Sequence, residues 1–275
     1  MKREKIKTFF VYFFLIIGAI IMLFPFYWMV VSSFKTRAEY NSFPPVWIPK
    51  NMLNFSNFVN AFKEAPFSRY FLNSIIVTGS SVLATGFTTI IGAYAFSRLK
   101  FPGKDFIFGL LVAFMMVPFE MLVITNYQTI SRLHWIDSYQ ALIVPFMTSI
   151  FYTYILKGFF DTIPDSLYFS ARIDGASNWK YLWRVMVPIA KPSLVTIMLL
   201  NAIASWNSFM WPQLVINSDR LRTVPFGLFA FISDAGADTQ MQMAAATLTV
   251  LPMIILFLFA RKYIVNGVAR GGIKG

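Results

Sequence analysis

Residues 8–34 read TFFVYFFLIIGAIIMLFPFYWMVVSSF, 27 positions without an Asp, Glu, Lys or Arg. About 20 apolar residues in a helix are enough to cross the hydrocarbon core of a bilayer. A signal peptide is the alternative for such a run after a basic N-terminus. Its apolar core would be about 7–15 residues long and would lead to a cleavage site of small residues. This run is longer and passes through Phe-Tyr-Trp-Met near its end, so we predict an uncleaved transmembrane helix.

The composition of the whole chain is also strongly apolar. Of its 275 residues, 57% are hydrophobic and 13% are charged, with a mean hydropathy of +0.61. Because soluble domains carry about 25% charged residues, the apolar excess here must face lipid. The net charge of +12 does not indicate nucleic-acid binding, since the basic residues lie between apolar runs rather than in one patch. Without cysteine and with His134 as its one histidine, the chain has no residues for thiolate, disulfide or multi-histidine sites.

Five further apolar runs follow the first. Backbone groups in lipid must pair within their own segment, so each run is expected to be a helix. The predicted spans are residues 8–34, 70–97, 106–131, 138–156, 192–218 and 239–260. The sequence therefore predicts an all-α membrane protein with six transmembrane helices, forming a single domain over residues 1–275.

The distribution of basic residues predicts the orientation. With a cytoplasmic N-terminus, the inner segments carry 16 of the 24 Lys and Arg residues and the outer segments carry 8. Cytoplasmic loops are enriched in basic residues, so both termini are predicted to be cytoplasmic. Lys35 and Arg37, just outside the first span, oppose this assignment locally, but the basic residues of the other inner segments outweigh them. The long outer segment 35–69 is expected to form short helices along the membrane surface.

The predicted inner segment 157–191 is 35 residues long, more than a simple connection needs. Pro164 followed by Asp165 indicates the start of a helix that continues through residues 167–173. Gly175 then permits a chain reversal, and Ser177 is placed to cap a second helix. We predict a helix–turn–helix that projects from the membrane.

One face of that second helix is expected to be apolar. Positions i, i+3, i+4 and i+7 carry the residues Trp179, Leu182, Trp183 and Met186. Tyr181 is expected to point elsewhere. Small residues near the turn would let another protein approach closely, whereas the tryptophans would equally suit a helix resting on lipid.

The same segment carries a resemblance to a known family. Residues 163–177 read IPDSLYFSARIDGAS and residues 187–192 read VPIAKP, which resembles the EAA loop of bacterial ATP-binding-cassette importer permeases. The ARIDGAS form is similar to the carbohydrate branch that includes the maltose permeases. SWNSFMWP at 205–212, TVPFGL at 223–228 and the tail 268–275 also resemble its second, MalG-like permease.

The resemblance implies a type I importer permease fold, with the loop at residues 161–192 forming a coupling helix between the fourth and fifth spans. It implies a second homologous permease, an ATPase dimer docked on this loop, an extracytoplasmic solute-binding protein and a sugar substrate. ATP and Mg would be bound by the ATPase, leaving no cofactor and no enzyme activity on this chain. The lack of a Gly-x-x-x-x-Gly-Lys-Ser/Thr loop agrees.

The resemblance also implies which residues contact the ATPase. They are Phe169, Ser170, Ala171, Asp174, Gly175, Ala176 and Ser177. Phe169 departs from the family pattern, which has a glutamate there, and Ser170 replaces the first of two alanines. Apolar packing of Phe169 is expected to take the place of the charged contact.

Candidates for the substrate path lie in the third and fifth spans. Glu120 is the one ionisable residue inside a predicted span, which indicates either a place in the path or a hydrogen bond to a neighbouring helix. Asn201, Trp206 and Asn207 combine hydrogen-bonding groups with an aromatic face, as sugar binding requires, although contacts between helices would also explain them. Trp211 is expected in the aromatic belt at the outer interface.

These observations predict a permease subunit of an ATP-driven, binding-protein-dependent importer of sugars, most readily oligosaccharides, in the bacterial cell membrane. A polyol or a sugar phosphate is the alternative substrate within this class. An ion-coupled secondary transporter is the alternative of another class, and it would usually need more helices and a coupling site. A membrane-embedded enzyme is disfavoured by the scarcity of acids and histidine within the spans.

Overall fold

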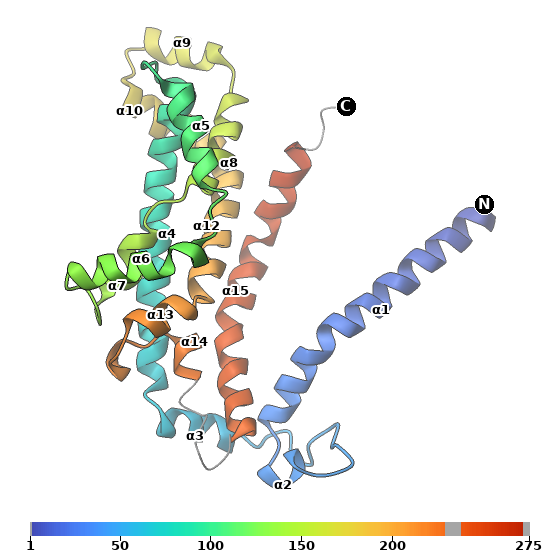
Figure 1. Cartoon of the computed structure of the whole chain (residues 1–275). Coiled ribbons are helices and arrows are strands. Elements are labelled where there is room, and N and C mark those ends of the chain that lie inside the picture. The colour runs from blue at the N-terminus through green and yellow to red at the C-terminus, as the bar shows by residue number, and fades with distance from the viewer. Residues whose placement is uncertain (1, 229–237, 272–275) are drawn as a thin grey trace. The chain divides into compact units, whose positions relative to one another are not determined.

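The computed structural model describes residues 2–228 and 238–271, and all regular secondary structure in these ranges is helical (Figure 1). Two compact units can be distinguished. The first comprises residues 1–68 and 227–252, and the second comprises residues 69–226 and 253–275. Residues 229–237, in the predicted outer segment, and residues 272–275, at the end of the predicted cytoplasmic tail, lie outside the described ranges.

The first unit contains α1 (Lys2–Ser33), α2 (Arg37–Tyr40), α3 (Ser56–Glu64) and the beginning of α15 (Thr239–Gly271). An apolar window of 18 residues in α1 contains no buried residue, as expected of a helix in contact with lipid or another protein. The side chain of Asn57 fixes α3 to the end of α1 by donating to the carbonyls of Ser33 and Lys35, both at 2.8 Å. The expected short helices in the outer segment 35–69 are confirmed.

The second unit is organised around α4 (Phe67–Arg98), α8 (Ile150–Asp161) and α12 (Lys191–Trp206), which run side by side in Figure 1. Their shared core includes Tyr94, Leu156, Phe160, Leu182 and Met186, all buried. The remaining elements surround these three helices. They are α5 (Lys104–Phe114), α6 (Phe119–Arg132), α7 (Tyr139–Ile143), η1 (Val144–Phe146), α9 (Asp165–Ile173), α10 (Asn178–Tyr181), η2 (Leu182–Met186), α11 (Val187–Ile189), α13 (Met210–Val215), η3 (Asp219–Leu221) and α14 (Val224–Gly227).

Four segments in the described ranges have the length and composition to span a membrane: Lys7–Ser33, Phe67–Arg98, Tyr139–Asp161 and Thr239–Arg261. Two pairs of helices reach the same length and composition only when each bent pair is counted as one span. Residues 104–114 and 119–132 meet at 97°, and residues 178–189 and 191–206 meet at 81°. The first pair corresponds to the predicted third span. In the second pair only residues 191–206 belong to the predicted fifth span, and residues 178–189 belong to the predicted coupling loop.

The prediction of an unbroken helix over residues 106–131 is wrong. α5 ends at Phe114, and its 11 residues reach about 16 Å at 1.5 Å per residue, about half the hydrocarbon thickness. Pro118 explains the break, because it lacks an N–H and disfavours helical backbone at the preceding residue. Its own extended backbone, with φ −61° and ψ 140°, starts α6 in a new direction.

The predicted fourth and fifth spans are also shorter or more interrupted than expected. Ser149 caps a new helix by accepting from the N–H of Tyr152 at 3.3 Å, so α8 starts in the middle of the fourth span. α12 ends at Trp206 instead of continuing to residue 218, and α13 follows after a turn. Asn207 closes α12 by donating its N–H to the carbonyl of Ile203 at 3.1 Å.

Candidate functional site

The helix–turn–helix segment, residues 164–189, has the predicted local structure at its turn. α9 ends at Ile173, and Gly175 adopts φ +72°, which disfavours residues with a side chain. The N–H of Ala176 reaches back to the carbonyl of Ala171 at 2.8 Å. Ser177 caps α10 by accepting from the N–H of Lys180 at 3.2 Å. The helix, the reversal and the cap are therefore confirmed.

The tip of this segment is largely open. Phe169 is 61% exposed, and Ser170, Asp174, Gly175 and Ser177 are exposed as well. Of the other residues expected to contact an ATPase, Ala171 is partly buried and Ala176 is 8% exposed, so they support the turn from below. A mostly exposed apolar ring beside small and polar neighbours leaves this tip accessible to another surface.

The predicted apolar face of the second helix is only partly correct. Leu182 and Met186 are buried, but Trp179 is 57% exposed and Tyr181 is completely buried. The reason is η2, a π-helical turn that begins at Leu182 and widens the helix. An i+5 hydrogen-bond pattern shifts the buried face relative to an α-helix, so Tyr181 turns inward where the α-helical spacing predicted otherwise.

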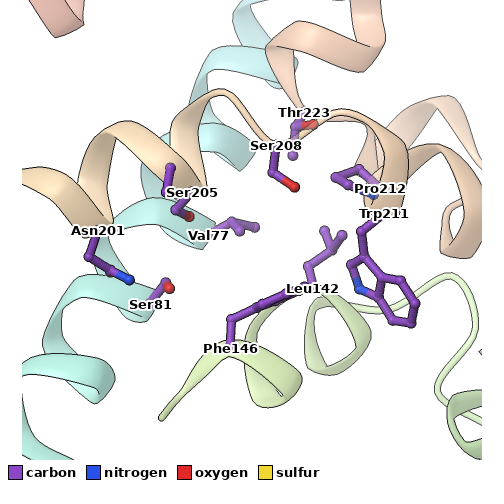
Figure 2. Close-up of a pocket in the computed structure, with 11 residues that line it drawn as sticks. Val77, Ser81, Leu142, Phe146, Asn201, Ser205, Ser208, Trp211, Pro212 and Thr223 are labelled. Carbon is purple, nitrogen blue, oxygen red and sulfur yellow. The ribbon is translucent and has the colours of Figure 1, made fainter. Parts of the chain in front are cut away.

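A cavity of about 170 Å³ lies in the second unit between α4, α7, η1, α12 and α13 (Figure 2). Its polar lining comprises Ser81, Asn201, Ser205, Ser208 and Thr223, and its apolar lining comprises Val77, Leu142, Phe146, Ala204, Trp211 and Pro212. Figure 2 shows Ser81 and Asn201 pointing toward one another and the Ser208 hydroxyl directed into the space.

The polar lining is neutral and incompletely paired. Asn201 Oδ1 and Thr223 Oγ1 are buried without a hydrogen-bond partner among the described residues. A buried polar atom without a partner is energetically costly, so these two oxygens favour a hydrogen-bonding occupant. No Asp, Glu, Lys, Arg or His belongs to the described lining. The cavity thus offers hydroxyl and amide groups beside an apolar wall.

The structure separates the four predicted path residues. Asn201 lines the cavity, whereas Trp206 is 3% exposed, packs near Phe71 with ring centroids 6.1 Å apart, and is not part of the lining. Asn207 is exposed at the end of α12. Glu120 is exposed in the first turn of α6 and is not part of the lining.

Trp211 corrects another expectation. It is 2% exposed and its indole Nε1 donates to the carbonyl of Ala141 at 2.8 Å, so it belongs to the core rather than to an aromatic belt. Ser81 was missed altogether, although α4 contains a signal for it. Buried small polar side chains recur on this helix at spacings of three or four residues: Ser74, Thr78, Ser81, Thr85 and Thr89.

The loop before α7 is held on the segment after α13 by one carboxylate. Asp137 has φ +59° and its Oδ1 accepts from the backbone N–H groups of Asn217 at 3.1 Å and Ser218 at 3.0 Å. The Ser218 hydroxyl donates to the same oxygen at 2.9 Å. The Ser218 N–H is the main cause that lowers the pKa of Asp137 below its ordinary value. The described residues contain no cluster of three or more His, Cys, Asp or Glu that could hold a metal ion.

Comparison with known proteins places these features in context. Residues 86–270 match the family described as "Binding-protein-dependent transport system inner membrane component". The arabinooligosaccharides transport system permease protein AraQ of Bacillus subtilis is 31% identical over 94% of this chain and 92% of its own length. The probable ABC transporter permease protein YurM of the same organism is 35% identical, covering 96% and 88% of the two chains.

Two further comparisons concern substrate and fold. The sn-glycerol-3-phosphate transport system permease protein UgpE of Yersinia pestis is 31% identical over 92% of both chains. A chain in the crystal structure of a bacterial ABC transporter involved in the import of alginate superimposes with a TM-score of 0.85. That match covers 96% of this chain and 98% of the other at 23% identity, and it confirms the importer permease fold.

Proposed function

The chain belongs to the family of binding-protein-dependent transport system inner membrane components, and on that premise we propose that it is the permease subunit of an ATP-driven sugar importer. It is a multi-pass membrane protein. The proposed complex contains a second permease, an ATPase dimer that binds and hydrolyses ATP with Mg, and an extracytoplasmic binding protein. Substrate crosses by alternating access, in which rigid bodies switch between two arrangements.

The exposed helix–turn–helix segment is the observation that carries this proposal. Its tip presents Phe169, Ser170, Asp174 and Ser177 to the surroundings while Tyr181 and Leu182 anchor its base in the core. A rigid base beneath an exposed tip is suited to receive movement from a separate motor subunit. We place this segment and both termini on the cytoplasmic side, as the distribution of basic residues supports.

The cavity favours a neutral sugar over a phosphorylated one. A phosphate group is recognised by charge-assisted hydrogen bonds, most often from Arg or Lys, and the described lining contains neither. Hydroxyl and amide groups such as those of Ser208 and Asn201 match sugar hydroxyls, and the indole of Trp211 forms part of the apolar wall. The relative AraQ is named for arabinooligosaccharides, which are neutral, so we propose a neutral oligosaccharide as substrate.

Reconstitution in proteoliposomes tests the proposal. Uptake of labelled arabinooligosaccharides and of sn-glycerol 3-phosphate is measured with the chain alone and with the ATPase, second permease and binding protein of the proposed complex. We expect ATP-dependent uptake of the neutral sugar by the complete complex only. Gradient-driven accumulation by the chain alone would favour a secondary transporter, and uptake of the phosphate ester alone would refute the assigned substrate class.

A pair of substitutions on α12 tests the role of the cavity. Asn201→Leu keeps the approximate size of the side chain but removes its hydrogen-bonding groups, so uptake should fall. Thr196→Val is the matched control, since the Thr196 hydroxyl bonds to Pro192 of its own helix at 3.1 Å and does not line the cavity. Equal uptake by both variants would remove the cavity from the path.

A further inference from the structure

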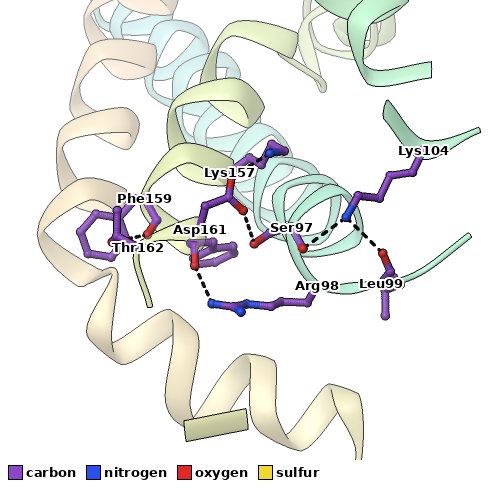
Figure 3. A network of polar contacts seen from close by, with 9 residues as sticks. Ser97, Arg98, Leu99, Lys104, Lys157, Phe159, Asp161 and Thr162 are labelled. Atoms are coloured by element: carbon purple, nitrogen blue, oxygen red, sulfur yellow. Dashed lines mark hydrogen bonds and ion pairs between the residues drawn. The ribbon is translucent and has the colours of Figure 1, made fainter. Parts of the chain in front are cut away.

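One arginine joins three helices at the base of the helix–turn–helix segment. Arg98 is the last residue of α4, and its side chain is only 11% exposed. Its Nη2 donates to the carbonyl of Phe160 at 2.8 Å and also to the carbonyl of Ile163. Its Nη1 forms an ion pair with the carboxylate of Asp165. Figure 3 shows the side chain extending from the end of α4 beneath the residues at the end of α8.

The three acceptors explain why an arginine is needed at this position. Phe160 lies in the last turn of α8, where carbonyl groups lack partners within the helix and a cation is favourable. Asp165 is the first residue of α9, where a negative charge is favourable. A planar guanidinium can serve acceptors in several directions at once, which a lysine ammonium on a flexible stem does less rigidly.

α9 depends on this contact because it has few other attachments. None of its residues is fully buried. The ring of Tyr168 packs on Tyr181 with centroids 5.2 Å apart, and its hydroxyl donates to Asn178 at 3.2 Å, so these contacts join α9 to α10. Tyr168 and Ala171 also pack against the core, but apolar contacts are not directional and permit sliding. The fork of Arg98 supplies the directional link.

We propose that Arg98 is a positioning residue that makes α9 move as one rigid body with α4 and α8. This inference rests on the proposed function, in which an ATPase moves the tip beyond α9. With Arg98 in place, displacement of α9 is transmitted to two helices of the transmembrane core. Without it, α9 tilts about its apolar contacts, and part of the movement is lost before it reaches α4.

Neighbouring contacts provide matched controls. The Ser97 hydroxyl donates to Asp161 at 2.7 Å, and Lys157 pairs with Asp161 at 2.7 Å (Figure 3). The Lys104 ammonium donates to the carbonyl of Ser97 at 3.3 Å. These interactions link α4, α5 and α8 in the same region, but none of them reaches α9. Removing Lys157 therefore perturbs local charge and stability without affecting the proposed link.

The experiment compares ATP hydrolysis with sugar uptake in the complete reconstituted complex. For Arg98→Ala we expect the ATPase to remain bound and active while sugar transported per ATP hydrolysed falls by at least about fivefold, the lower end of typical coupling between sites. Arg98→Lys should restore part of this ratio, and Lys157→Ala should leave it unchanged. A purely structural role would lower both activities together and leave the ratio as in the unmodified complex.

A distance measurement keeps the inference testable if Arg98→Ala assembles poorly. The chain contains no cysteine, so spin labels at Ser166→Cys on α9 and Leu83→Cys on α4 report a single distance. Both positions are exposed. Asp165→Asn removes the ion pair but leaves the carbonyl contacts, and it should broaden the distance distribution in the complex.

The outcomes separate this inference from the proposed function. An unchanged distribution in Asp165→Asn together with an unchanged transport ratio in any assembled Arg98 variant overturns the role of Arg98, even when the unmodified complex imports sugar. Failure of the unmodified complex to import any sugar in an ATP-dependent way refutes the proposed function. In that case, a broadened distance distribution in Asp165→Asn would still support Arg98 as the link between α9 and α4.

Discussion

Replacing Asp137 with alanine should lower the free energy of unfolding by about 2.5–4 kcal/mol. The substitution removes three contacts to one carboxylate oxygen, from the Asn217 and Ser218 N–H groups and the Ser218 hydroxyl. A hydrogen bond contributes about 0.5–1.5 kcal/mol net, and we take the lower half of this range because the site is only partly buried. Alanine at φ +59° adds about 1 kcal/mol of backbone strain.

Asparagine is the informative control at this position. Its amide oxygen accepts the same hydrogen bonds, and asparagine tolerates the left-handed region as aspartate does. Asp137→Asn should therefore cost less than half as much as Asp137→Ala. Thermal unfolding in detergent measures both, and a chain of this size shifts by roughly 2–4 °C per kcal/mol. Equal midpoints for the alanine and asparagine variants would refute the hydrogen-bonding argument.

The pH dependence provides a second check of the same site. The hydrogen bonds lower the pKa of Asp137 below its ordinary value of 3.8. The ionised form is therefore stabilised by folding, and this stability is fully present above the unfolded pKa and is lost as pH falls through the folded pKa. The stability advantage over Asp137→Asn should be constant near neutral pH and shrink below about pH 4. An advantage that grows on acidification would contradict the sign of the shift.

Three further predictions concern the turn and the tip. Gly175→Val should impair transport through backbone strain at φ +72° of about 1–3 kcal/mol, although no other atom lies within 4 Å of a Cβ there. Gly158→Ala is the control and should be tolerated, because the space around it inside α8 is equally open. Normal uptake by Gly175→Val would contradict the argument from strain. Ser177→Cys should crosslink to a cysteine in the cleft of the ATPase, and labelling only by lipid-phase reagents would instead indicate a helix resting on the membrane. Phe169→Ala should weaken copurification of the ATPase, because 61% of the ring is exposed and available for apolar contact; unchanged copurification would show that this contact is dispensable.

The local structure of the helix–turn–helix could be predicted because its signals are local. Pro164, Gly175 and Ser177 act on the backbone within a few residues, and the structure places a helix start, a reversal and a cap at these positions. Tyr181 could not be placed, because hydrophobic spacing assumes 3.6 residues per turn and the π-helical turn η2 violates that assumption. The direction in which the buried face turns depends on packing against α4 and α8.

Hydropathy could not predict the breaks in the spans, and it could not predict the cavity. An apolar run shows that a segment tolerates lipid, but it does not show that the helix continues, and Pro118 redirects the chain inside such a run. The cavity brings together Ser81, Asn201 and Thr223 from separate parts of the sequence. Their proximity follows from the packing of α4 and α12, which no local pattern specifies. Asn201 was predicted as a path residue from its residue type, whereas Thr223 was not predicted.

The break between α5 and α6 also has a consequence for what must surround it. Met116 is 83% exposed within the chain, beside backbone that leaves the helical pattern before Pro118. Irregular backbone at membrane depth is tolerated only where protein or a water-filled cavity covers it. In the proposed complex the second permease would supply this cover, and an isolated copy would lack it.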